Sequence, residues 1–95
     1  MKLLSIKKSQ AKGKKWTATF LIDDKERVVH FGATGYLDYT IGATDKQREA
    51  YLSRHDKEKN QPANTAGALS YWVLWGESRS MNKNIQAFKK RYKLS

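Results

Sequence analysis

Two aspartates in the middle of the chain are the residues best spaced for metal chemistry. A metal-dependent nuclease needs two or three carboxylates that converge on Mg²⁺, and Asp38 and Asp45 flank a loop able to bring them together. Both also have ordinary structural roles, because aspartate caps helices and accepts backbone hydrogen bonds in glycine-containing turns. We favour these structural roles, and we interpret Asp23, Asp24 and Glu26 as a hairpin turn rather than a metal site.

The two histidines are the other candidates for catalysis. His30 and His55 are separated by a loop, but a histidine pair without cysteine and without the HExxH spacing is a weak zinc signal. Structural, hydrogen-bonded histidines are the better interpretation, and the absence of cysteine excludes disulfides and thiolate metal sites. We therefore predict that the protein is not an enzyme and has no metal or other cofactor. A metal-dependent nuclease is the alternative.

A glycine-containing loop, Gly32-Ala33-Thr34-Gly35-Tyr36, has the small residues that let a backbone approach phosphate. It lacks the GxxxxGK[ST] pattern of phosphate-binding loops. Two glycines alone indicate a turn in which the backbone needs positive φ angles, so the loop is a weak signal.

Positive charge is the strongest feature of the 95 residues, whose net charge is +10. Residues 1–22 hold six lysines and no acid, and residues 80–95 hold five bases and no acid. The other eight bases lie in residues 23–79 with all nine acids, so the ends sum to +11 and the middle to −1. A generally basic, solvated surface is one interpretation. The segregation favours another, a polyanion-binding face built from both ends of the chain.

The predicted ligand is nucleic acid, and we expect DNA rather than RNA. Lysine outnumbers arginine at both ends, which favours contacts to phosphate over sequence-specific base contacts. Aromatic residues adjoin the bases, as in proteins that stack single-stranded bases, although Trp16 fits a core position better. The predicted binding residues are Lys7, Lys8, Lys12, Lys14, Lys15, Arg48, Arg54, Lys89, Lys90, Arg91, Tyr92 and Lys93.

These residues must be positioned by a single small domain covering residues 1–95, in which 39% of residues are hydrophobic and 12% aromatic. Apolar and polar residues alternate weakly over residues 2–8, which predicts a first strand. Residues 15–22 alternate clearly, with apolar side chains on one face and threonines on the other. A turn over residues 23–26 and a returning strand over 27–31 complete a three-stranded antiparallel meander.

Three helices follow the strands in the prediction, giving an α+β domain with the order βββααα. Thr44 or Asp45 caps the first helix, which runs to about residue 57, and Thr44 with Gln47 has capping-box spacing. Asn64 or Thr65 caps a second helix through Trp75, which is apolar nearly all round and is expected to be buried. Ser80 caps a third, whose residues Ile85, Phe88 and Tyr92 are expected to face the core.

The middle of the chain also contains a pattern of small, aromatic and basic residues. Its members are His30-Phe31-Gly32, Gly35-Tyr36, Asp38-Tyr39-Thr40, Arg48, Tyr51, Arg54-His55, Thr65-Ala66-Gly67, Ser70, Trp72, Leu74 and Trp75. With this pattern, residues 30–76 resemble a small uncharacterised protein family of large DNA viruses and some phages. Gly42-Ala43 stands where that family has a histidine-lysine pair, and Asn60-Gln61-Pro62 replaces a tryptophan-containing stretch. The family has no assigned activity, so the resemblance implies a viral setting and no mechanism.

The viral resemblance adds two alternatives to nucleic-acid binding. In the first alternative the chain is a structural or interaction protein of a virion. In the second it is an inhibitor that binds a host protein. In the virion alternative the basic ends lie on acidic protein surfaces and a Tyr71/Trp75 stripe docks on a partner. We expect the protein in the virion or the infected cell, and otherwise in the cytoplasm. We expect neither secretion nor membrane binding, because the apolar stretch before Lys7 is too short for a signal peptide.

Overall fold

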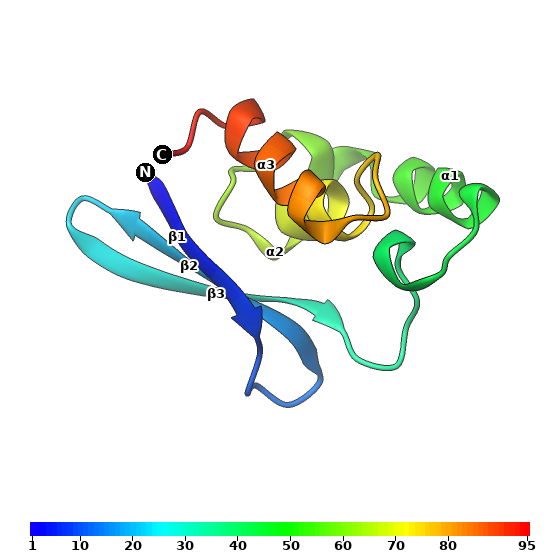
Figure 1. Ribbon diagram of the computed structural model, residues 1–95, viewed down its shortest axis with the longest axis horizontal. Coiled ribbons are helices and arrows are strands. Elements are labelled where there is room, and N and C mark those ends of the chain that lie inside the picture. Colours follow the sequence, from blue (N-terminus) through cyan, green and yellow to red (C-terminus); the bar gives the residue numbers. More distant parts are fainter.

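A three-stranded antiparallel sheet followed by helices makes up the fold, in a computed structural model that describes all residues 1–95 (Figure 1). The strands are β1 (Lys2–Lys8), β2 (Lys14–Ile22) and β3 (Lys25–Ala33), in the order β1-β2-β3. The helices are α1 (Asp45–Arg54), α2 (Ala66–Leu69) and α3 (Met81–Arg91). Three further helical segments are the 3₁₀ helices η1 (Tyr39–Ile41) and η2 (Asp56–Asn60) and the π-helical η3 (Ser70–Leu74). The predicted α+β class and the meander followed by three helices are confirmed.

The sheet has one face in the core and one face open to solvent. Ala18, Phe20 and Phe31 point inward and are fully buried, as the alternation of β2 predicted. The turn between β2 and β3 is shorter than expected, because β3 already begins at Lys25. Asp23 and Asp24 alone make this turn, both with positive φ. Two consecutive residues with positive φ form a turn whose backbone twist matches the twist of the two strands that it joins.

The helices lie on one side of the sheet, where α2 and η3 contact β3, and no helix covers the opposite face (Figure 1). The continuous helical segment 66–74, here called the central helix, lies at the centre of the core, where Leu69 and Val73 are fully buried. This confirms the expectation that the second helix is the buried one. Tyr71 and Trp75 are also buried, at 8% and 9% exposure. The prediction that Tyr71 and Trp75 form a docking stripe is therefore wrong, because both side chains are buried and are not available to a partner.

The helix starts follow the predicted caps, and the helix ends do not all follow the prediction. Thr44 and Gln47 form the complete capping box at the start of α1, while the hydroxyl groups of Thr65 and Ser80 cap α2 and α3. α1 ends at Arg54 rather than near residue 57, and the chain continues as the 3₁₀ segment η2. From Ser70 the second helix becomes π-helical, which no sequence signal predicted.

α3 packs on the core mainly through Phe88, which is 1% exposed, with Ile85 and Tyr92 partly buried beside it. A polar residue on the same helix, Asn84, is also buried. Its amide nitrogen donates to the carbonyls of Val73 and Ser78, at 2.8 and 2.7 Å, and its side-chain oxygen accepts from the Ser78 N–H. Asn84 therefore ties α3 to the end of the central helix, a role that sequence periodicity did not reveal.

None of the helices combines the length and the apolar character that crossing a membrane requires.

Candidate functional site

The bases at the two ends of the chain do not form the single continuous face that the sequence led us to expect. In Figure 1 the two termini lie toward one end of the sheet, and the β1–β2 turn lies toward the other end. β1 has seven residues, and at roughly 3.4 Å per residue it separates the N-terminus from the β1–β2 turn by about 20 Å. Most of the N-terminal lysines are at or beyond the far end of β1, so the charge is divided into two patches.

The first patch, here called the turn patch, consists of Lys7, Lys8, Lys12 and Lys14. All four side chains are exposed, and none has a carboxylate within 4.0 Å, since the ion pairs of the protein involve other bases. The turn itself is held by backbone hydrogen bonds, including the 3.0 Å bond from the Ser9 N–H to the Lys15 carbonyl. The turn patch is therefore an ordered group of uncompensated positive charges.

The turn patch continues into a shallow hollow on the bare face of the sheet, with a volume of about 280 Å³. Lys7 and Lys8 line the hollow together with hydrogen-bonding side chains, among them Thr17, Thr19 and His30. The Nδ1 atom of His30 lies 2.8 Å from the Thr17 hydroxyl. The structure thus places His30 in a hydrogen-bonded pair on the sheet surface.

Lys15, expected among the phosphate-contacting residues, instead has partners inside the protein. Its ammonium group is 2.9 Å from the Asp38 carboxylate and also donates to the Tyr36 carbonyl. Asp38, which is 2% exposed, accepts further hydrogen bonds from the N–H and hydroxyl of Thr40. The charge of Lys15 is therefore used to compensate a buried carboxylate. The prediction that Asp38 bonds backbone amides in a turn is confirmed.

Gly32 lies between Lys15 and the central helix, and its missing side chain leaves room for both. A Cβ atom at this position would lie 3.0 Å from Cδ1 of Leu74 and 3.3 Å from Cβ of Lys15. Its φ angle of +78° is also in the region that favours glycine. The glycine allows Lys15 to reach across β3 to Asp38.

A pocket of about 570 Å³ opens beside this ion pair, and we call it the aromatic pocket. Residues from the end of β3 and the following loop, from α1 and from the central helix line it. Several of them belong to the pattern that carries the family resemblance: Gly32, Tyr36, Asp38, Tyr51, Arg54, His55, Ser70, Leu74 and Trp75. The aromatic pocket is therefore where residues scattered over half the sequence come together.

Three stacked rings form one wall of the aromatic pocket. The Tyr51 ring lies between His55 and Trp75, with ring centroids 4.1 and 4.4 Å apart and interplanar angles of 20° and 7°. Burial raises the pKa of Tyr51 to about 12, and the Glu58 carboxylate adds to the rise. Tyr51 is therefore a neutral phenol at physiological pH, and its ring contributes shape and apolar surface.

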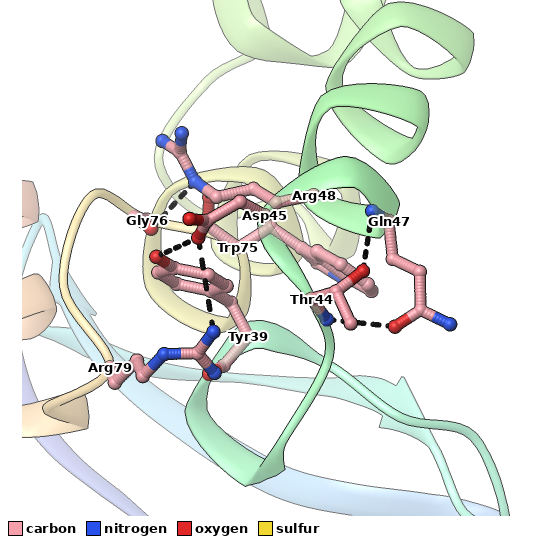
Figure 2. Close-up of polar contacts among 8 residues, drawn as sticks. All are labelled: Tyr39, Thr44, Asp45, Gln47, Arg48, Trp75, Gly76 and Arg79. Carbon is pink, nitrogen blue, oxygen red and sulfur yellow. Dashed lines mark hydrogen bonds and ion pairs between the residues drawn. The ribbon is translucent and has the colours of Figure 1, made fainter.

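A second cluster of side chains, shown in Figure 2, anchors the loop that forms the floor of the pocket. The hydroxyl of Tyr39 donates to Asp45 at 2.6 Å, and the Arg79 guanidinium lies 4.1 Å from the centre of the Tyr39 ring. Arg79 also donates to the Tyr39 carbonyl. The hydrogen bond to Asp45, followed by desolvation, raises the pKa of Tyr39. Because Tyr39 directly follows Asp38, this cluster holds the buried carboxylate in place.

The two arginines predicted on the first helix differ in availability. The Nε atom of Arg48 donates to the carbonyls of Trp75 and Gly76, at 3.1 and 3.0 Å, so this side chain joins α1 to the end of the central helix (Figure 2). Arg54 is exposed, lines the aromatic pocket and has no carboxylate within 4.0 Å. Of the two, Arg54 is free to contact a ligand.

The second basic patch, at the C-terminal end of α3, is the C-terminal patch. Lys90, Arg91 and Lys93 are exposed and Lys89 is half-buried. The Arg91 guanidinium lies 3.8 Å from the centre of the Trp72 ring. Tyr92, predicted beside these bases as a stacking residue, packs against Phe88 and donates its hydroxyl hydrogen to the Gln61 carbonyl at 2.8 Å. Its ring is therefore part of the core edge.

The groups weighed for catalysis are dispersed among separate structural contacts. Asp38 pairs with Lys15, and Asp45 accepts from Tyr39. His30 is bonded on the sheet surface, while His55 stacks on Tyr51 and pairs with Glu58. No group of three or more histidine, aspartate or glutamate side chains is arranged to hold a metal ion. In the glycine-containing loop, the Thr34 N–H donates to the Gly13 carbonyl. This amide is therefore already bonded within the protein and does not point to a phosphate.

Comparison with known proteins assigns the chain to a family. Residues 4–55 match the family described as "Family of unknown function (DUF5754)", and because the match covers more than half of the chain, the protein belongs to that family. The matched region contains the sheet apart from the first two residues of β1, and it also contains the turn patch, the Lys15–Asp38 pair and α1. Neither a search of curated proteins nor a search of solved structures gave a match.

Proposed function

We propose that the protein binds nucleic acid through the turn patch, by contacts to phosphate. The observation that supports this most strongly is the group of four exposed lysines at one end of the sheet, with no carboxylate near any of them. Uncompensated cations on one ordered element attract a polyanion, and binding gains free energy from the counterions that the polyanion releases.

The composition of the patch indicates the mode of binding. It contains lysines and no arginine. Lysine contacts phosphate as a point charge, whereas bidentate hydrogen bonds to base edges favour arginine. The hydroxyl groups of Thr17 and Thr19 lie in the adjoining hollow and add hydrogen bonds of the kind that position a backbone. We therefore propose binding with little sequence preference, to DNA in preference to RNA, by an accessory protein in a viral or phage setting.

The size of the patch sets the expected salt dependence. Four lysines that each neutralise one phosphate give a log–log slope of about −3.6 on duplex DNA. Had both ends of the chain contributed to one face, the slope would be steeper, so this measurement also tests the division into two patches.

The test is fluorescence anisotropy with a labelled duplex of random sequence at about 50 mM salt, where binding driven by phosphate contacts is strong. The first variant replaces the turn patch with glutamines: Lys7→Gln, Lys8→Gln, Lys12→Gln and Lys14→Gln. The matched control removes the same number of charges from the other end of the molecule: Lys83→Gln, Lys89→Gln, Lys90→Gln and Lys93→Gln. All eight side chains lie outside the core cluster, so both variants are expected to fold.

We expect the turn-patch variant to lose at least tenfold in affinity and the control variant to lose much less. An equal loss in the two variants would mean that net charge, and not this site, carries the binding. If the unaltered protein does not bind the duplex at 50 mM salt, the proposed function is wrong.

A further inference from the structure

We infer that the aromatic pocket receives one unpaired nucleobase from a strand whose phosphates the turn patch holds. This inference rests on the proposed function and extends it, because it assigns to the protein a preference for nucleic acid with an unpaired end or a single-stranded segment.

The aromatic pocket and the turn patch are joined through the backbone. Lys14 is paired in the sheet with Ala33, which lines the pocket, and the Thr34 N–H donates to the Gly13 carbonyl at 3.1 Å. Lys12 and Lys14 flank Gly13, so the lysines of the turn lie next to the part of β3 that lines the pocket. A strand held by these lysines therefore passes the opening.

The residues at the mouth of the pocket suit a flat, apolar ring. Tyr36 lines the pocket and is 72% exposed, the largest exposure among the large hydrophobic side chains that project into solvent. Its backbone is held, because its carbonyl accepts a hydrogen bond from Lys15. The stacked rings of His55, Tyr51 and Trp75 add further flat aromatic surface to the lining of the pocket. An exposed tyrosine on an anchored backbone is available to stack on a base, and such stacking accepts any base.

The polar groups of the pocket suit the rest of a nucleotide. Arg54 is exposed and unpaired at the rim, where it adds a cation for the phosphate. Lys15 compensates the Asp38 carboxylate, so the buried acid does not repel an anion. Gln47 uses its oxygen to accept from Thr44, which leaves its amide hydrogens free for the acceptor atoms of a base edge.

The dimensions decide which form of nucleic acid fits. A volume of about 570 Å³ lies in the range of small-ligand pockets, and is suited to a single nucleotide. Bases in a duplex are stacked and paired, so their rings reach a pocket only after they leave the stack. An unpaired end or a single-stranded gap supplies a base without that cost. Nucleic acids with such features are therefore the preferred ligands.

The experiment compares three DNA hairpins that share one duplex stem. The first ends in a single unpaired 2-aminopurine nucleotide, the second ends in an abasic nucleotide with the same phosphate, and the third is blunt. Anisotropy gives the affinity for each, and 2-aminopurine emission reports whether the unpaired base is stacked. We expect the base to raise affinity at least about fivefold over the abasic end, the lower end of what stacking one base on an aromatic side chain contributes. We also expect its emission to fall on binding.

Two variants locate the effect. Tyr36→Ala removes an exposed ring and is expected to abolish the advantage of the base while duplex affinity is retained. Leu4→Ala is the matched control, because Leu4 is also exposed, at 48%, and lies on β1 away from the pocket. The control is expected to keep the full advantage.

The outcomes separate the two proposals. If all three hairpins bind equally well and the emission is unchanged, the pocket does not take a base and the inference is overturned, while the turn-patch proposal stands. If the base is preferred equally in the Tyr36→Ala variant, a surface other than this pocket receives it, which also overturns the inference. If none of the hairpins binds, the proposed function has failed and this inference fails with it.

Discussion

Substituting Gly32 by alanine gives the most direct test of how the Lys15–Asp38 pair is built into the fold. The added methyl group would lie 3.0 Å from Cδ1 of Leu74 and 3.3 Å from Cβ of Lys15. Neither neighbour moves away easily: Leu74 is 1% exposed in the core, and the far end of Lys15 is bound to the Asp38 carboxylate.

The expected loss of stability has two parts. A non-glycine residue at a φ of +78° costs about 1–2 kcal/mol relative to glycine. Forcing a methyl group into a packed site costs about 1–3 kcal/mol more. We therefore expect Gly32→Ala to lower the free energy of unfolding by about 2–5 kcal/mol, a large share of the stability of a domain this small.

Urea denaturation followed by tryptophan fluorescence or circular dichroism measures the loss, and two other glycines separate its parts. Gly13 and Gly35 have φ angles of +80° and +86°, and a Cβ atom at either would meet nothing within 4 Å. Alanine there carries only the backbone cost, about 1–2 kcal/mol, and the effect on the unfolded chain is common to all three variants. If Gly32→Ala is no more destabilising than Gly35→Ala, the packing argument is refuted.

Three further predictions concern the caps, the core and the pocket wall. Thr44→Ala should destabilise the protein by about 1 kcal/mol through loss of the capping box, and Thr44→Ser should restore most of this in urea denaturation. Asn84→Ala should cost about 2–4 kcal/mol because it strands buried backbone groups, whereas Asn82→Ala, on an exposed position of the same helix, should change stability by less than about 0.5 kcal/mol. The pKa of Tyr51 is about 12 in the folded protein and about 10 in the unfolded chain. The stability that depends on its neutral phenol is complete below pH 10 and is lost as the pH rises towards 12. Urea midpoints should therefore fall more steeply over this range in the unaltered protein than in Tyr51→Phe, and parallel curves would contradict the assignment.

The elements of the fold were predictable because their signals are local. The alternation of Trp16, Ala18 and Phe20 depends only on neighbouring residues, and the strand that it predicted is present. The capping box likewise depends on the four residues from Thr44 to Gln47, and it forms as predicted. Helix ends were less predictable, because α1 stops at Arg54 with no glycine or proline there to signal it.

The candidate site was less predictable because it depends on contacts between distant residues. Lys15 resembles its neighbours Lys12 and Lys14 in sequence, and only the folded chain shows that it reaches Asp38, 23 positions away. The split between the two basic patches has a similar cause. Counting charges by position cannot show that β1 runs away from the termini (Figure 1).

Asn84 illustrates the same limit for the core. Its sequence position suits a polar surface residue, yet the side chain is buried and bonds the carbonyls of Val73 and Ser78 and the Ser78 N–H. Gly76 leaves space for it, since a Cβ atom there would approach the Asn84 side chain closely.

The π-helical turn at Ser70–Leu74 has a consequence for how related chains can vary in length. The Trp75 N–H bonds to the Ser70 carbonyl, five residues back, where an α-helix would use a carbonyl four residues back. One extra residue is accommodated in the turn, and at about 100° per residue Trp75 occupies the angular position that residue 74 would have in a regular helix. A relative one residue shorter between these points can thus keep an equivalent tryptophan against Tyr51 with an ordinary helix. A relative of equal length must keep the wide turn or rotate the indole out of the stack.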